Sequence, residues 1–155
     1  MEKKYKLTDE TINLCGKKLF RIKALKDFED VKKGDKGGFI EDEHNLSHDG
    51  NSWVYGNAMV DGNAMVYGDA CVYGDAWVCG NIKIENNFDY IVFKNWWSSG
   101  RYFTWTRSND MWKVGCFYGT GEELIKKAYK DSELSGRQYE RIVKYVEGIK
   151  KENGK

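Results

Sequence analysis

Residue types that could carry acid–base chemistry are scarce in this chain. Its 155 residues include two histidines, His44 and His48. A histidine side chain can act as a general base near neutral pH, so either residue could deprotonate a hydroxyl or an amine. Both lie in an irregular segment that is equally well explained as a surface or as the cap of a repeat. The histidines therefore indicate no catalytic constellation, and we expect a protein that is not an enzyme.

The cysteines indicate neither a metal site nor a redox motif. Cys15, Cys71, Cys79 and Cys116 lie far apart and form no C-x-x-C pair. This spacing predicts neither a disulfide framework nor a zinc site, and we expect free thiols in a reducing cytosol. An Asn/Asp position recurs through residues 45–81, but turns favour these residues without any bound calcium. The sequence predicts no metal and no cofactor.

Aromatic and basic residues alternate in the C-terminal part of the chain. Such side chains on a sheet can stack bases or sugars, and Trp, Tyr and Arg are also the usual anchors of protein interfaces. The same rings could instead build a core beneath two helices. We expect some of them to be exposed and to bind a protein, with nucleic acid or carbohydrate as the alternative ligand. The predicted partner-binding residues are Trp96, Trp97, Arg101, Trp105, Arg107 and Trp112.

Composition sets limits on the class of protein. The 25 basic and 24 acidic residues give a net charge of +1, so total charge does not indicate a polyanionic partner. Aromatic residues make up 15% of the chain, an excess that is relevant to interfaces. No apolar stretch approaches the roughly 18 residues that a membrane helix needs. The charged start Met1–Lys6 is not followed by the apolar region of a signal peptide. We expect a cytoplasmic protein that does not associate with membranes.

The middle of the chain repeats every six residues. In each unit Ala-X-Val has the length of a short strand, and Tyr/Asp-Gly-Asn/Asp has the chemistry of a turn. Because alternate strand residues share a face, alanine and valine should point into one narrow core. The recurring inward residues are Val54, Val60, Val66, Val72, Val78 and Ile84, with Ala58, Ala64, Ala70 and Ala76.

The segments before the repeat predict an N-terminal hairpin. Lys4–Leu7 and Lys18–Leu25 are strand-like and flank turn residues at 13–17. Residues 27–33 could form one helical turn. Phe39–Trp53 fits the six-residue pattern poorly, as expected of a terminal repeat, so the N-terminal residues should cover that end.

The segments after the repeat predict a meander and two helices. Tyr90–Trp97, Arg101–Thr106 and Trp112–Tyr118 are aromatic-rich strand patterns separated by turns. Thr120–Glu123 is a capping box that should open a helix of about ten residues. A second helix should run from Ser135 to about Lys151. Its apolar stripe, expected to face the core, is Tyr139, Ile142, Val143, Val146 and Ile149.

These motifs resemble a known family. The repeat, together with Gly37–Ile40, Asn45–Ser47 and Trp53–Ala58, is similar to uncharacterised hexapeptide-repeat proteins, many carried by bacteriophages and prophages. The segment Trp105–Glu123 also resembles a phage-borne C-terminal module. The resemblance implies a left-handed parallel β-helix with about 18 residues in each coil.

The resemblance places some apolar residues outside the coil. At about 18 residues a coil, Trp53 stacks with Cys71 and Met59 with Trp77. The rings of Tyr55, Tyr67 and Tyr73 should stack along one ridge, an unusual surface for this family. Outward apolar residues on two faces would leave a large exposed patch, so we expect a dimer or trimer. The predicted self-association residues are Trp53, Met59, Met65, Cys71 and Trp77.

Together, these expectations define a fold class and a function. The fold class is mainly β, a short left-handed parallel β-helix with an N-terminal hairpin cap and a C-terminal β-meander plus two helices. The expected divisions are residues 1–38, 39–85 and 86–155. The expected function is that of a non-enzymatic phage accessory protein that self-associates and binds, and thereby inhibits, a host protein complex such as a CRISPR defence effector. The alternatives are a hexapeptide-type acyltransferase using His44 or His48, and a sponge for a small molecule or nucleotide.

Overall fold

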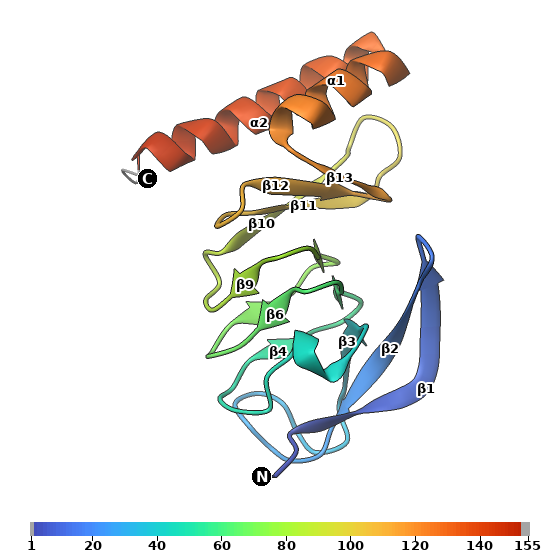
Figure 1. Ribbon diagram of the computed structural model, residues 1–155, viewed down its shortest axis with the longest axis vertical. Coiled ribbons are helices and arrows are strands. Elements are labelled where there is room, and N and C mark those ends of the chain that lie inside the picture. The colour runs from blue at the N-terminus through green and yellow to red at the C-terminus, as the bar shows by residue number, and fades with distance from the viewer. Residues whose placement is uncertain (1, 153–155) are drawn as a thin grey trace.

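The computed structural model describes residues 2–152, and its elements follow one another along a single long axis (Figure 1). An N-terminal hairpin rises beside the repeat, and a small antiparallel sheet with two helices lies beyond it. Neither helix in the described part of the chain is long and apolar enough to cross a membrane.

The N-terminal strands form the predicted hairpin. β1 (Tyr5–Leu14) pairs antiparallel with β2 (Lys17–Ala24), and β2 pairs antiparallel with β3 (Lys36–Ile40). The β1–β2 turn contains Cys15 and Gly16, whose φ angles are 50° and 83°. A tight hairpin turn that matches the strand twist needs positive φ at both positions. The hairpin prediction is confirmed, and β1 is longer than expected.

The helical turn expected at residues 27–33 is not formed. Phe28 and Val31 make an isolated antiparallel bridge instead. Glu29 between them has a φ of 46°, which lies outside the right-handed helical region.

The repeat forms six two-residue strands, which pair in parallel with the strand 18 residues away. The three pairs are β4 (Trp53–Val54) with β7 (Cys71–Val72), β5 (Met59–Val60) with β8 (Trp77–Val78), and β6 (Met65–Val66) with β9 (Lys83–Ile84). A 3-10 helix, η1 (Glu43–Asn45), precedes them. The recurring valines and alanines are all fully buried, as predicted. The pairings of Trp53 with Cys71 and of Met59 with Trp77 are also confirmed.

The predicted fold class, a left-handed parallel β-helix with a hairpin cap, is wrong. The strands are divided among four small sheets, and the largest mixes antiparallel and parallel pairs in the order β1-β2-β3-β5-β8. The hairpin therefore does not cap a solenoid, because it continues through β3 into the strands of the repeat. The physical reason is the length of the strands. A two-residue strand makes few backbone hydrogen bonds. The longer antiparallel strands therefore determine which strands lie side by side in the sheet.

The meander and both helices are confirmed. β10 (Tyr90–Lys94), β11 (Tyr102–Thr106), β12 (Met111–Val114) and β13 (Phe117–Gly119) pair in sequence as an antiparallel sheet. The third expected strand is split in two by a turn at Gly115, whose φ is 56°. α1 (Gly121–Asp131) begins at the predicted capping box, and α2 (Glu133–Glu152) starts two residues before the expected Ser135.

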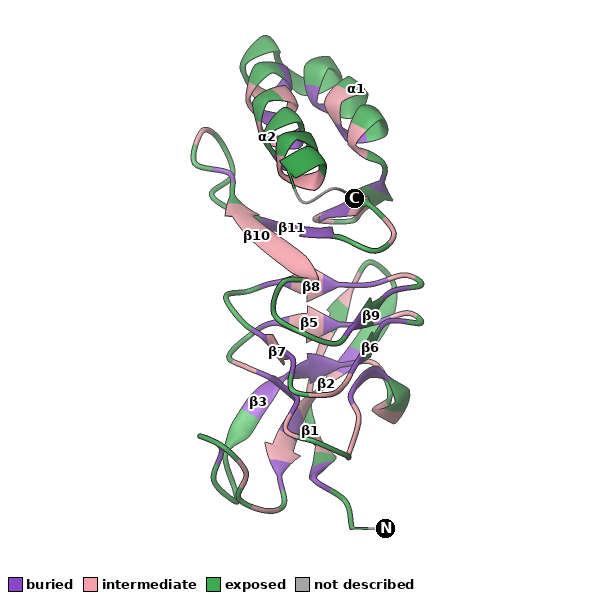
Figure 2. Cartoon of the chain, turned by 90° about the vertical axis from the view of Figure 1, so that its left-hand side faces the viewer, coloured by how far each residue is buried: buried purple, intermediate pink, exposed green. Residues whose placement is uncertain are grey.

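The buried apolar side chains of the described residues form two hydrophobic cores, and the buried segments are purple in Figure 2. The first lies among the hairpin and the repeat, and the second lies between the meander and the helices. The meander is joined to the repeat by hydrogen bonds between the two. The Trp77 amide donates to Thr104 Oγ1 at 2.9 Å, and the Tyr90 hydroxyl donates to the Cys71 carbonyl at 2.7 Å.

Candidate functional site

A cleft of about 790 Å³ opens between the hairpin, the repeat and the meander. Its floor is a row of three apolar side chains, Phe39, Met59 and Trp77, from the neighbouring strands β3, β5 and β8. The parallel register places these residues side by side, because Phe39 pairs with Met59 and Met59 with Trp77. β3 and the repeat thus supply an apolar floor.

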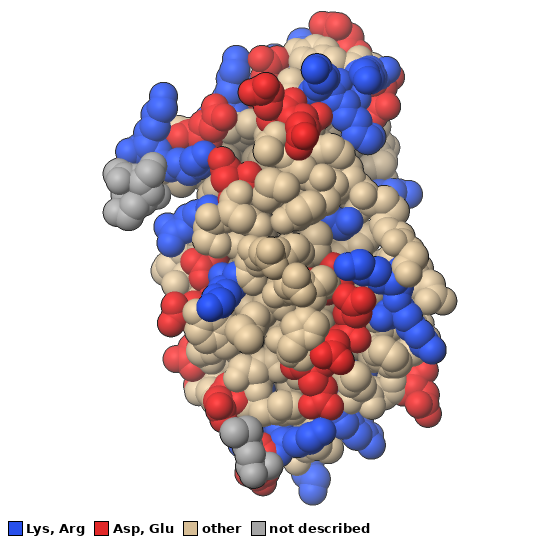
Figure 3. Space-filling view, viewed as in Figure 1, with Lys and Arg blue, Asp and Glu red and all other residues tan. Residues whose placement is uncertain are grey.

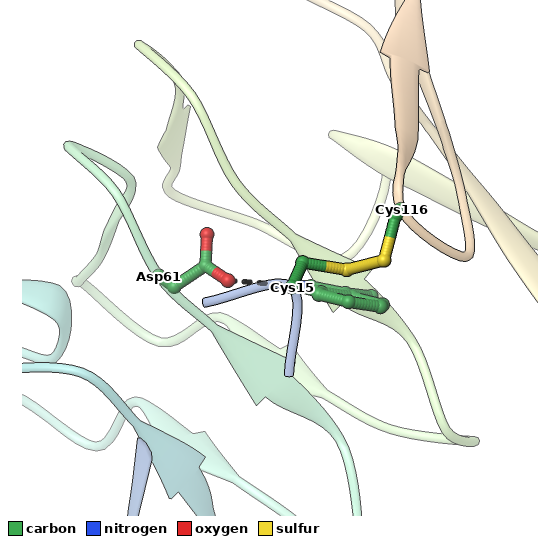
Figure 4. Close-up of a disulfide and its surroundings, with 4 residues drawn as sticks. Cys15, Asp61 and Cys116 are labelled. Atoms are coloured by element: carbon green, nitrogen blue, oxygen red, sulfur yellow. Dashed lines mark hydrogen bonds between the residues drawn. A yellow bond between two sulfur atoms is a disulfide. The ribbon is translucent and has the colours of Figure 1, made fainter. Parts of the chain in front are cut away.

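The walls of the cleft come from opposite ends of the chain. Ile12 and Leu14 of β1 line one side, and Tyr102 at the start of β11 lines the other. A disulfide between Cys15 and Cys116 joins the two walls, and it links the β1–β2 turn to the β12–β13 turn (Figure 4). The cleft is therefore bounded by a covalent link between residues 101 positions apart.

This disulfide corrects the expectation of four free thiols. The Cα atoms of Cys15 and Cys116 are 5.7 Å apart, inside the usual range for a disulfide. Sequence spacing could not indicate the pair, because only the folded arrangement of the two turns brings the cysteines together. Cys71 and Cys79 are free, as expected.

The indole of Trp77 is fixed in place. Its Nε1–H donates to Asp61 Oδ2 at 2.9 Å, the dashed line of Figure 4. The Lys113 ammonium lies 4.2 Å from the centre of the Trp77 ring. Asp61 is only 3% exposed, and Lys17 Nζ lies 3.9 Å from its Oδ1. With its polar edge bonded in this way, the indole can offer an ordered apolar face to a ligand.

One arginine of the cleft is occupied within the protein. The Arg21 guanidinium donates to Glu10 at 2.8 Å and to the Gly37 carbonyl at 2.6 Å, and it lies 4.2 Å from the Phe39 ring centre. The same hydrogen bond holds the pKa of the Glu10 carboxyl below its usual value. Arg21 and Glu10 therefore tie β1 and β2 to β3.

A second arginine of the cleft is available. Among residues 2–152, the Arg101 guanidinium makes no hydrogen bond or ion pair. The Asp75 carboxylate, which also lines the cleft, makes none within the same residues. Arg101 lies against the β12–β13 turn, where a Cβ on Gly115 would be 3.5 Å from Arg101 Nη1. The cleft thus combines an apolar floor with one unpaired cation and one unpaired anion.

The other predicted partner-binding residues do not gather at this site. Trp105 and Trp112 are each 1% exposed in the second core. Trp97 packs 5.0 Å from the Tyr139 ring and donates to Ser135 Oγ at 3.0 Å. Trp96 packs edge-on against the Trp97 ring, with ring centres 5.8 Å apart, and 69% of its surface is exposed.

The face shown in Figure 3 carries no basic patch of the kind that binds nucleic acid. Arg107 of the predicted set pairs with Asp89 at 3.6 Å, away from the cleft. On the face shown in Figure 3, basic and acidic residues are interspersed, and no broad patch of one sign forms.

The predicted self-association residues lie on different parts of the surface. Trp53 is buried against Phe28, with ring centres 5.2 Å apart. Met59 and Trp77 lie in the cleft, and Cys71 is half-buried beneath the loop before β10. Met65 is exposed on a third side. These residues form no shared patch, because the N-terminal segment and the hairpin cover two of the three sides. Tyr55 and Tyr73 stack as predicted, with ring centres 4.6 Å apart, but Tyr67 follows β6 on another side and does not belong to this stack.

Neither histidine offers a free ring nitrogen. His44 Nδ1 lies 2.7 Å from Asp42 Oδ2, and Nε2 lies 2.8 Å from the Gly62 carbonyl oxygen. Because both neighbours are acceptors, the ring is favoured in its protonated form, and the Asp42 carboxylate raises the pKa of His44. A general base must instead have an unoccupied lone pair.

His48 is also engaged. Its Nδ1 accepts from the Lys4 amide at 3.0 Å, its Nε2 donates to Glu43 at 2.8 Å, and its ring stacks on Tyr5 at 4.2 Å. No group of three or more His, Cys, Asp or Glu side chains suited to a metal occurs within residues 2–152.

Burial distinguishes the two free cysteines. Cys79 is 8% exposed, and burial raises the pKa of its thiol to about 11, whereas Cys71 is partly exposed. Because the thiolate is the reactive form, we expect iodoacetamide at pH 8 to alkylate Cys79 roughly a hundredfold more slowly than Cys71. Peptide mass spectrometry over time measures both rates. Equal rates would contradict the burial of Cys79.

Three residues of the cleft were predicted as site residues from the sequence. Arg101 was predicted to bind a partner, and Met59 and Trp77 were predicted to mediate self-association. Sequence reasoning missed the wall residues Ile12 and Leu14, although their alternation in a strand was a signal that one face of the hairpin is apolar. Compared with known proteins, the chain matches no family model and no curated protein.

Proposed function

We propose that the chain is a non-enzymatic binding protein whose ligand has an apolar body and an anionic end. The observation that carries this proposal is the unpaired Arg101 guanidinium beside the apolar row of Phe39, Met59 and Trp77. The apolar body would lie on the row, and the anion would face Arg101.

The dimensions of the cleft support this proposal. Ligand pockets typically occupy about 300–1,000 Å³ and are lined mainly by apolar side chains with a few polar groups that set orientation. The cleft has a volume of about 790 Å³ and this kind of lining. Tryptophan and arginine are the side chains most often responsible for binding energy at interfaces. A planar guanidinium also matches a carboxylate or sulfonate in geometry.

The partner that we propose is chosen from the function expected for a phage accessory protein. A host protein that presents an apolar side chain beside an acidic one is the partner we propose, in line with the resemblance to phage proteins. The volume would equally admit a free small molecule, which is the sponge activity considered from the sequence.

Disulfides persist mainly in oxidising compartments, so a cytoplasmic location would expose the Cys15–Cys116 bond to reduction.

The fluorescent dye 8-anilinonaphthalene-1-sulfonate tests the cleft, since it joins aromatic rings to an anion. We expect the folded protein to bind it, and Arg101→Gln to weaken binding roughly fivefold, the loss of a partly solvated ion pair worth about 1 kcal/mol. Asp75→Asn should strengthen binding by a similar factor, because it removes a like charge. Fluorescence titration gives the dissociation constants.

Arg107→Gln is the matched control. It removes the same charge from an exposed position outside the cleft lining, so it should leave dye binding unchanged. Equal weakening by Arg101→Gln and Arg107→Gln would show a general charge effect. No binding by the wild-type protein would remove the cleft as the site.

A further inference from the structure

We infer that the Cys15–Cys116 disulfide is a redox clasp for the cleft. In the oxidised protein it holds the tip of the hairpin, residues 13–18, beside the meander, and its reduction releases the tip and opens the cleft. The effect on the ligand rests on the proposed function, whereas the movement of the tip does not.

The disulfide is placed where it controls the cleft wall. Cys15 and its neighbour Leu14 line the cleft from the hairpin, and Cys116 and its neighbour Gly115 line it from the meander. Within the described residues, no hydrogen bond or ion pair joins residues 5–24 to residues 90–152. The disulfide is thus the one bonded connection between these two walls.

Little else holds the tip. Lys17 Nζ lies 3.8 Å from Glu41 and 3.9 Å from Asp61, and the Lys17 side chain is substantially exposed. An exposed ion pair such as Lys17–Glu41 holds its side chains only weakly. The base of the hairpin is firmer, because Leu19 is fully buried and Arg21 is bonded to the β3 backbone. The pairs Asn13–Lys18 and Leu14–Lys17 extend the β1–β2 ladder past this anchored base, and beyond it the position of the tip depends on the disulfide.

The bond can be reached by a reductant. Cys15 and Cys116 are both exposed, and exposed disulfides are the ones most easily reduced. A small dithiol is sufficient. Its thiolate attacks one of the two sulfurs, the S–S bond breaks and the other cysteine leaves as a thiolate. The second thiol of the reductant then resolves the mixed disulfide. Two protein thiols form as the dithiol is oxidised to its own disulfide.

Release of the tip should weaken ligand binding. Leu14 would no longer be held as part of a preformed wall, and binding would have to order the tip again. Ordering one or two side chains and their backbone corresponds to a loss of roughly tenfold in affinity.

Hydrogen–deuterium exchange tests the movement without any ligand. The full-length protein is compared with and without dithiothreitol, and the peptide containing residues 13–18 is followed, with the α1 peptide as the internal control. At short labelling times, before exchange through global unfolding is detected, we expect faster exchange at the tip alone after reduction. Cys15→Ser without reductant should reproduce the reduced pattern, and Cys71→Ser should not, because Cys71 forms no disulfide.

A parallel titration with 8-anilinonaphthalene-1-sulfonate tests the effect on binding. Faster exchange at the tip with roughly tenfold weaker dye binding supports the clasp. Unchanged exchange at the tip overturns it whatever the dye does. An equal rise in exchange at the tip and in the α1 peptide at these short times also overturns it, since the tip would then have no movement of its own. Tip release with no dye binding in either form refutes the proposed function and leaves the movement established.

Discussion

Cys15→Ser is expected to lower the free energy of unfolding by about 4–5 kcal/mol, one of the two largest effects that we predict for this chain. The disulfide closes a loop between residues 101 positions apart. Closing a loop of this length restricts the unfolded chain far more than the folded one, and this difference stabilises the native state. Urea denaturation of the wild-type and variant proteins measures the change.

Cys71→Ser is the control for this prediction. Its thiol is free and only partly buried, so its replacement should change the free energy of unfolding by less than about 1 kcal/mol. If Cys15→Ser were no more destabilising than Cys71→Ser, the disulfide would not connect the two ends of the chain in solution.

Gly38→Ala should destabilise the protein by about 3 kcal/mol. Gly38 lies in β3, the strand through which the hairpin joins the repeat. A Cβ at this position would overlap the Ala58 carbonyl oxygen and lie 2.6 Å from Val54 Cγ1. Because the Ala58 oxygen is a backbone atom that accepts a hydrogen bond from Phe39 just before β5, the backbone itself would have to shift. Thermal unfolding monitored by circular dichroism reports the loss.

Gly148→Ala makes the same chemical change at an open position. Gly148 lies in α2, and a Cβ there would meet nothing within 4 Å. Alanine is favoured over glycine inside a helix, so this variant should gain up to about 1 kcal/mol. Equal stability of Gly38→Ala and the wild-type protein would mean that β3 does not pass this close to the repeat.

Local patterns in the sequence predicted much of the secondary structure. The burial of the alanine and valine columns follows from a period of six, and the start of α1 follows from the capping box of Thr120 and Glu123. Both features depend on residues that are close in sequence. The turn at Cys15 and Gly16 is of the same kind.

Long-range features could not be predicted in this way. The period of the repeat shows which side chains point inward, but it does not show that β5 and β8 share a sheet with the hairpin. Strand alternation shows that Trp105 and Trp112 lie on a sheet, but it does not show that helices bury them. The cleft depends on both of these features and on the Cys15–Cys116 bond, so only Arg101 was found in its proper role.

The most direct test of the account is a map of where the ligand binds. Uniformly ¹⁵N-labelled, oxidised protein is titrated with 8-anilinonaphthalene-1-sulfonate, and amide and indole shifts are recorded by two-dimensional NMR. We expect the largest shifts at Met59, the Trp77 indole, Arg101 and the two disulfide-linked turns. Shifts centred instead on the exposed Trp96 and Tyr145, with the cleft unchanged, would contradict it.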